Sequence, residues 1–250
     1  MHPLRTALLS LSCLIAVPAI GEDLPSFGDS SSGIVSQREE RELGHAYLSI
    51  IRGQTAQIPD PLLKNYLEDT VYRLAESSQV QDPRFSFILL KSPQLNAFAA
   101  PGGIIGVNGG LFLYAQNEGE FASVLAHELA HLSQRHFARG LEARQQMQIP
   151  MMAAMLGGII AMAAGAGDAG VAAIASSQAA AMQAQQRFSR QNEQEADRIG
   201  MQTLGNAGYD PRSMPDMFNR LMSQYRYNSK PPEFLMSHPV TESRIADTRN

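Results

Sequence analysis

The short stretch His127-Glu128-Leu129-Ala130-His131 has the residue types and the spacing of a site that holds and uses a metal ion. On an α-helix, at about 100° per residue, the two histidines lie on one face a turn apart, so both imidazoles can reach one Zn²⁺. Glu128 lies beside that face, where its carboxylate can take a proton from a water molecule held by the ion. The stretch predicts two ligands and a base, although the pattern also arises by chance.

A third ligand must therefore come from elsewhere in the chain. His136 follows His127 by nine residues, which on a continuous helix places it on the opposite side, so we expect a surface residue that does not bind the ion. The continuation found in metzincins is also missing, because Gln134 and Phe137 stand where that pattern has glycine and histidine.

The segment NEQEADRIG offers carboxylates from a later helix. Glu193 and Asp197 are four residues apart on a stripe that also carries small and apolar residues, and buried carboxylates need a cation or hydrogen-bond donors. We expect a metal ligand from this helix, with Asp197 accepting a hydrogen bond from a ligand histidine. Glu195 points elsewhere and is expected to be solvated.

His238 lies in the segment MSHPVTESR, where Pro239 restricts it to an extended conformation. Two hypotheses remain open for it. It approaches the metal, either as a fourth ligand that holds the site closed or as a donor to the reaction's oxyanion, or it is an ordinary loop histidine.

Four motifs in the order NAFAAPGG, AHELAH, SRQNEQEAD and SHPVTESR carry a family resemblance. Over residues 36–250 the chain resembles the HtpX- and Oma-type gluzincin metallopeptidases, most closely their periplasmic, β-barrel assembly-enhancing (BepA-type) branch. The resemblance implies one Zn²⁺ per chain, with His127, His131 and Glu193 as ligands and Glu128 as general base. It also implies a zincin-like α+β domain, mostly helical, with a small sheet beside the active-site helix.

The same resemblance implies a function in protein quality control. The expected activity is that of a zinc endopeptidase that hydrolyses misfolded or stalled outer-membrane polypeptides, with the β-barrel assembly machinery as a partner. The tetratricopeptide repeats with which this branch usually continues are not found in the sequence. An alternative is a zinc-stabilised, chaperone-like assembly factor whose closed site rarely cleaves.

The elements that must position these residues begin with two helices, predicted at 36–53 and 60–79, followed by strand-forming segments at 84–91 and 95–115. A helix should begin at Asn117 and carry the metal motif to about Arg144. The segment Asn96, Ala97, Phe98 and Ala99 is expected to form an edge strand that binds an extended substrate; the alternative is a hairpin already paired on both edges.

Residues 149–186 are rich in alanine, glycine and methionine. A single membrane span here would put His131 and Glu193 on opposite sides of the bilayer, and two spans would be short and poorly apolar. We therefore expect a pair of helices or a mobile lid over the active site, and no stable transmembrane span in the mature chain. Beyond it, Gly208 is placed to end one helix and Pro211 to start another.

The N-terminus and the composition bound the class of protein. Residues 1–21 have the pattern of a cleaved signal peptide, followed by a flexible lead-in at 22–35, which predicts export to the periplasm. The single cysteine, Cys13, lies in the signal, so thiol catalysis and cysteine-bound zinc are excluded. Removing 1–21 leaves 19 basic and 24 acidic side chains, a net charge of −5, which argues against nucleic acid as a partner.

Overall fold

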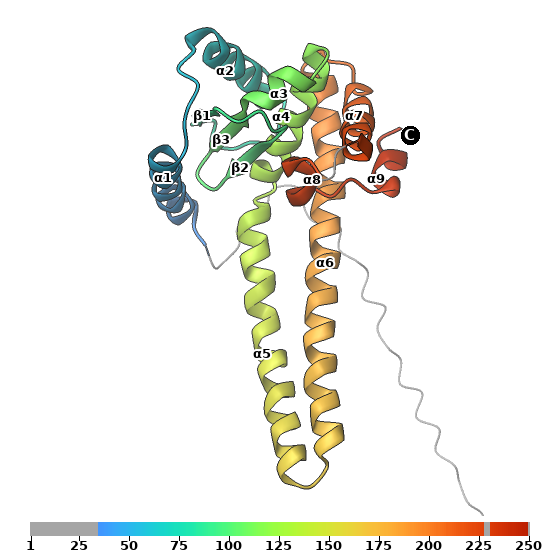
Figure 1. The fold of residues 1–250 in the computed structure, drawn as a ribbon. Coiled ribbons are helices and arrows are strands. Elements are labelled where there is room, and N and C mark those ends of the chain that lie inside the picture. Colours follow the sequence, from blue (N-terminus) through green and yellow to red (C-terminus); the bar gives the residue numbers. More distant parts are fainter. Residues whose placement is uncertain (1–34, 228–230, 250) are drawn as a thin grey trace, which may run out of the picture. The chain divides into compact units, whose positions relative to one another are not determined.

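The computed structural model describes residues 35–227 and 231–249, which belong to one compact unit. The predicted signal peptide and residues 22–34 of the lead-in lie outside the described residues. The elements, drawn in Figure 1, are α1 (Gln37–Gln54), α2 (Pro61–Glu76), β1 (Ser86–Leu90), β2 (Ala97–Ala100), β3 (Ile104–Asn108), α3 (Gly109–Tyr114), α4 (Glu118–Ser133), α5 (His136–Ala163), α6 (Gly167–Asn206), α7 (Ser213–Tyr227), α8 (Glu233–Ser237) and α9 (Glu242–Asp247).

Helix α4 is central and carries the metal motif. The Asn117 side chain caps it by accepting a hydrogen bond from the Glu120 N–H at 2.9 Å, as the sequence predicts. Every residue from Glu120 to Ala130 is buried, because α4 packs against α2, β2, α6 and α7. This burial on all sides holds the motif in one orientation.

The sheet has three strands in the order β1-β3-β2, with β1 parallel and β2 antiparallel to the central β3. Gly102 and Gly103 have φ of +78° and +81° in the turn between β2 and β3, a conformation that favours glycine. Among the described residues β2 pairs on one side only, so it is the edge strand predicted from the sequence. Its binding of substrate stays a prediction.

The expected α+β, mostly helical fold with a small sheet beside the active-site helix is confirmed, but two boundaries were wrong. Part of the segment expected to be sheet forms the short helix α3. The helix expected to reach Arg144 ends at Ser133, because Arg135 adopts a left-handed conformation with φ of 49°. Its side chain donates to Glu40 (3.2 Å) and to the Val35 carbonyl (2.6 Å), which stabilises a break that no glycine or proline marks.

Helices α5 and α6 pack along each other as a long hairpin that extends away from the sheet (Figure 1). Residues 149–186 form its distal half, so of the two expected arrangements the structure has the helix pair; movement as a lid stays a prediction. Within the described residues, α5 alone has the length and the apolar composition that would allow it to cross a membrane.

The C-terminal segment returns to the sheet and to α4. Gly208 has φ of +86° just after the end of α6, and α7 begins two residues after Pro211, close to the predicted start. Glu233 of α8 accepts hydrogen bonds from the side-chain amides of Asn96 (3.3 Å) and Asn108 (3.1 Å). These bonds anchor α8 beside β2 and so fix the loop that follows it.

Candidate metal centre

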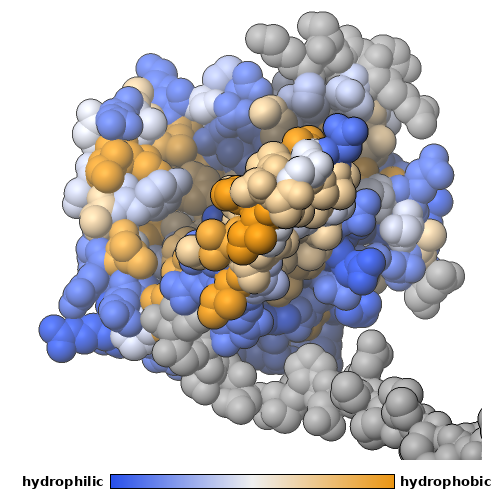
Figure 2. Space-filling view, turned by 90° about the horizontal axis from the view of Figure 1, so that it is seen from below, coloured by the Kyte–Doolittle hydropathy of each residue, from blue (hydrophilic) through white to orange (hydrophobic). Residues whose placement is uncertain are grey.

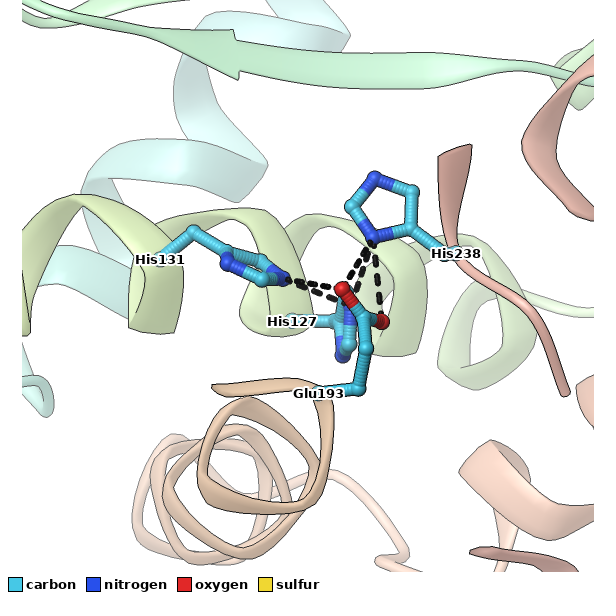
Figure 3. A group of neighbouring side chains, drawn as sticks. All are labelled: His127, His131, Glu193 and His238. Atoms are coloured by element: carbon cyan, nitrogen blue, oxygen red, sulfur yellow. Dashed lines mark hydrogen bonds and ion pairs between the residues drawn. The ribbon is translucent and has the colours of Figure 1, made fainter. Parts of the chain in front are cut away.

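Three segments far apart in the sequence meet at one cluster of side chains (Figure 3). Helix α4 supplies His127 and His131, whose Nε2 atoms are 3.0 Å apart. Glu193 of α6 places one carboxylate oxygen 3.4 Å from His127 Nε2 and the other 3.6 Å from His131 Nε2. The structure thus brings together the three residues expected to bind zinc.

His238 belongs to the same cluster. Its Nδ1 lies 3.1 Å from each oxygen of Glu193 and 3.3 Å from His127 Nε2, and its Nε2 lies 3.4 Å from Glu128 Oε1. One potential ligand atom from each of His127, His131, Glu193 and His238 falls within 4.8 Å of all the others. Of the two hypotheses for His238, the geometry supports the approach to the metal site.

Asp197 lies behind His127, with its Oδ1 3.0 Å from His127 Nδ1, a position compatible with the supporting role expected for this carboxylate. Arg244 of α9 holds Asp197 through two hydrogen bonds of 2.6 and 2.7 Å and also reaches Glu193 at 3.0 Å. Burial opposes a charge on His127, but the carboxylates of Asp197 and Glu193 outweigh it and raise the His127 pKa to about 9.

His136 contradicts the expectation of a surface residue. Its side chain is 5% exposed, its Nδ1 lies 2.8 Å from His131 Nδ1, and its Nε2 lies 3.1 Å from Glu195. The expectation assumed one continuous helix, whereas the break at Arg135 turns His136 back toward the site. Glu195, expected to be solvated, is instead partly buried, with a side chain 20% exposed, and it also accepts a 2.9 Å hydrogen bond from Arg139.

Glu128 is buried beside β2 and lies against the metal cluster. Its Oε2 accepts a 2.8 Å hydrogen bond from the Ala99 N–H, and its Oε1 has no hydrogen-bond partner among the described residues. Burial raises the Glu128 pKa, while the nearby histidines His238 and His127 oppose the shift. The carboxylate thus has an oxygen without a hydrogen bond, 3.4 Å from His238 Nε2, and an increased affinity for a proton, as a general base requires.

The donor set fits a zinc ion. Two imidazole nitrogens and one carboxylate oxygen, with a third imidazole close by, are the ligand types that Zn²⁺ binds in proteins. The electrostatics agree, because the carboxylates of Glu128, Glu193 and Asp197 lie buried together, and among the described residues Arg244 is the lysine or arginine paired with them. Buried carboxylates in such excess favour a bound cation.

A pocket of about 220 Å³ opens next to the cluster, between the first turns of α5 and the middle of α6. Its walls include His131 and Glu193 of the cluster together with the apolar side chains of Phe137, Leu141 and Phe188. Its size and lining suit one apolar side chain of a bound chain.

Sequence reasoning missed two residues of the site, His136 and Arg244. Arg244 lies within the motif SHPVTESR, but a buried arginine has no distinguishing spacing of its own. His136 follows the metal motif closely in the sequence, and this closeness was a usable signal. It was set aside because the helix was assumed to be unbroken.

Comparison with known proteins agrees with this geometry. The chain is 39% identical over 250 residues to the beta-barrel assembly-enhancing protease of Escherichia coli (strain K12), covering 96% of this chain and 51% of that protein. It is 42% identical over 228 residues to the protein of the same name from Yersinia pestis, covering 91% and 46%.

A more distant relative is the mitochondrial metalloendopeptidase OMA1 of Schizosaccharomyces pombe, 27% identical over 213 residues, with 83% of this chain and 59% of that protein covered. The chain spans about half the length of the curated bacterial relatives it matches. The model of Peptidase family M48 matches residues 61–250, which include every residue of the cluster. This confirms the family resemblance, and the chain therefore belongs to peptidase family M48.

Proposed function

We propose that this chain is a zinc-dependent endopeptidase in which His127, His131 and Glu193 hold the metal and Glu128 is the general base. The observation that supports it most directly is the buried Oε1 of Glu128, which accepts no hydrogen bond from a described residue, beside a set of three zinc-type donors. A bound zinc ion supplies a Lewis acid that makes water more acidic and withdraws charge from a peptide carbonyl.

The residues of the chain supply the remaining chemistry. Glu128 accepts the proton of the attacking water and returns it to the amine that leaves. Asp197, held by Arg244, keeps His127 oriented with Nε2 toward the metal. An extended substrate adds to the free edge of β2 through its backbone groups, and the pocket at Phe137, Leu141 and Phe188 receives one of its side chains.

We assign His238 to the control of access. Because its Nδ1 lies among the ligand atoms and its Nε2 faces Glu128, a substrate carbonyl can approach only after the loop that follows α8 moves. Once displaced within the site, the imidazole is placed to donate to the oxyanion of the reaction. His238→Ala should change basal cleavage or zinc affinity, and a variant unchanged in both contradicts this role.

The substrates proposed for the chain are misfolded or stalled outer-membrane polypeptides in the periplasm, reached after export by the predicted signal peptide. This proposal is supported by the similarity to bacterial relatives that are named beta-barrel assembly-enhancing protease. The β-barrel assembly machinery is the corresponding partner.

A second candidate function is a zinc-stabilised assembly factor. The observation that favours it is the set of four protein donors, since structural zinc sites are closed by four protein ligands whereas catalytic sites keep one position open. In this case the site stabilises the fold and the chain binds unfolded polypeptides without cleaving them.

Incubation of an unfolded β-barrel polypeptide with the zinc-loaded chain separates the two functions. The peptidase proposal predicts loss of full-length polypeptide with the wild type and at least a hundredfold slower loss with Glu128→Gln. Equal loss in both samples, or none in either while both suppress aggregation, contradicts peptidase function. Zinc content of both proteins is the control, because Glu128 is not a ligand and its variant should bind one ion.

A further inference from the structure

The distal part of the α5–α6 hairpin, residues 149–182 (the hairpin tip), carries many large apolar side chains that are half or more exposed. Figure 2 looks along the hairpin and shows apolar residues gathered over it, with hydrophilic residues around. The most exposed are Ile149 (77%), Met152 (60%), Leu156 (59%), Ile159 (50%), Ile160 (68%), Val171 (60%) and Met182 (66%). A surface of this extent on a protein marks an interaction site.

The two helices of the hairpin tip approach closely at Gly158 and Gly170, where Ile174 and Met162 also pack, while most of the large apolar side chains lie outside. A Cβ added at Gly158 would lie 2.8 Å from the Gly170 carbonyl oxygen, and one added at Gly170 would collide with the Gly158 carbonyl oxygen. A helical hairpin built for water buries its large apolar side chains between the helices. Close approach through glycine with apolar side chains outward is the arrangement of helices in lipid.

Several backbone groups of the hairpin tip are satisfied within the chain, even at the turn, although the start of α6 has no side-chain cap. Gly165, with φ of +88°, donates its N–H to the Met162 carbonyl, and Ala166 donates to the Ala161 carbonyl. At the start of α6, the Gly170 N–H bonds to the Ala166 carbonyl. Internal satisfaction of these groups is what entry into a hydrocarbon phase requires.

Charge is distributed as an anionic membrane surface would require. Between residues 145 and 186 the only charged side chain is Asp168, at the turn, whereas the base of the hairpin carries the exposed arginines Arg144, Arg187 and Arg190. None of these three arginines forms an ion pair with a described side chain. Arginines at the end of an apolar helix can reach lipid phosphates while their stems remain in the apolar layer.

We propose that the hairpin tip inserts into the surface of a lipid bilayer with anionic headgroups, as a re-entrant hairpin. Residues 149–163 of α5 are roughly 20 Å long, which exceeds one hydrocarbon leaflet of about 15 Å and falls short of a full span. Because the chain enters the bilayer and returns to the surface from which it entered, His131 and Glu193 stay on the same side of the bilayer. Insertion would hold the peptidase site at the membrane surface, and it does not depend on the proposed peptidase activity.

Vesicle flotation of the full chain tests the proposal. The wild type should bind vesicles of phosphatidylethanolamine and phosphatidylglycerol, and the combined Leu156→Gln, Ile159→Gln and Ile160→Gln variant should lose at least tenfold in partitioning. The matched control replaces equally exposed apolar residues outside the hairpin, Ile50→Gln, Leu62→Gln and Leu113→Gln, and should bind as the wild type does. The N-terminal apolar segment is common to all samples.

The arginines and the depth of insertion have separate readouts. Arg144→Gln, Arg187→Gln and Arg190→Gln should each weaken binding to the anionic vesicles about fivefold and leave binding to phosphatidylcholine vesicles unchanged. The chain contains no tryptophan, so Ile160→Trp introduces a single reporter. Its emission should shift to shorter wavelength with vesicles and be quenched by brominated lipid tails, whereas that of Leu62→Trp should not change.

Three results would overturn the proposal. The first is equal loss of vesicle binding in the hairpin triple variant and its control, or no binding by the wild type. The second is dimerisation of the wild type without lipid that the hairpin triple variant abolishes, with Ile160→Trp unaffected by vesicles, which assigns the surface to a second copy. The third is hairpin-dependent binding of an unfolded polypeptide without vesicle binding, which assigns it to substrate.

Discussion

At the scale of single residues, the most specific feature of the site is the contact of His136 with His131. His136 contacts the Nδ1 of His131 and is itself fixed by Glu195, so in the proposed zinc site it would set which ring nitrogen of His131 faces the ion. We predict that His136→Ala weakens zinc binding about tenfold to a hundredfold. Competition with a chromogenic chelator measures this, and exposed His45→Ala is the matched control.

A zinc affinity equal in the His136 and His45 variants would show that His136 only fills space.

The structure also shows which residues of the site could be predicted from their spacing in the sequence. The pair His127 and His131 followed from helical geometry, and Glu193 from a second helix with carboxylates on a buried stripe. The location of His136 did not, because Arg135 ends the helix through tertiary hydrogen bonds that local sequence does not specify.

At the scale of elements, the distance between α4 and α6 determines whether the ligands meet. A Cβ at Gly200 would lie 3.1 Å from His127 N and 3.0 Å from the Met214 methyl group. We predict that Gly200→Ala separates the helices, lowers the free energy of unfolding by about 1 to 3 kcal/mol and weakens zinc binding. Chemical denaturation and zinc titration measure the two effects.

The control for that change is another glycine on a helix. Gly157 has open space around its Cβ position, so Gly157→Ala should raise stability by up to about 1 kcal/mol through helix propensity. If Gly200→Ala behaves like Gly157→Ala, the close approach of α6 to His127 does not matter for the site. Such approaches are invisible in the sequence, which predicted the helices but not which glycine lies at their contact.

A second contact between elements joins α4 to α7. Glu120, with a side chain 3% exposed, accepts hydrogen bonds from Arg220 at 2.7 and 2.9 Å and from the Gln116 N–H at 2.8 Å. Burial alone would raise its pKa, but these donors outweigh burial and hold the pKa below the ordinary value of 4.5. The ionised form is therefore favoured in the folded protein.

The sign of the pH effect follows from this lowered pKa. The stabilisation is fully present above pH 4.5 and is lost as the pH falls through the folded-state pKa, because protonation removes the pair. We predict that Glu120→Gln lowers the free energy of unfolding by about 2 kcal/mol at pH 7 and by less at pH 3. Chemical denaturation between pH 3 and pH 7 measures this loss. The control is Glu68→Gln, at a partly exposed pair with Lys64, which should change the free energy of unfolding little. A loss from Glu120→Gln that is equal at both pH values would contradict the assignment.

At the scale of the whole molecule, the candidate metal cluster brings together segments that are far apart in the sequence. Periodicity and resemblance predicted the α+β class, and a helix pair was one of the two arrangements expected at 149–186. The order of the motifs carried the resemblance. The outward-facing apolar surface of the hairpin was not predicted, because composition alone does not say which face of each helix meets the other. The cluster itself connects α4, α6 and the loop between α8 and α9, so binding of zinc should stabilise the fold as one unit.

Removal of zinc tests this linkage. With free zinc about a hundredfold above its Kd, the bound ion adds about 2.7 kcal/mol to stability, so chelation should lower Tm by roughly 5 to 10 °C. Adding zinc back should restore the Tm of the wild type. It should raise the Tm of Glu193→Gln by less, because that variant lacks one of the proposed ligands. Calorimetry with and without chelator measures both. Because Glu193 also contacts Arg244, the variant's zinc-free Tm is the reference for its own zinc response. An equal gain in both proteins would exclude Glu193 from the ligands, whatever the chain's activity on polypeptides.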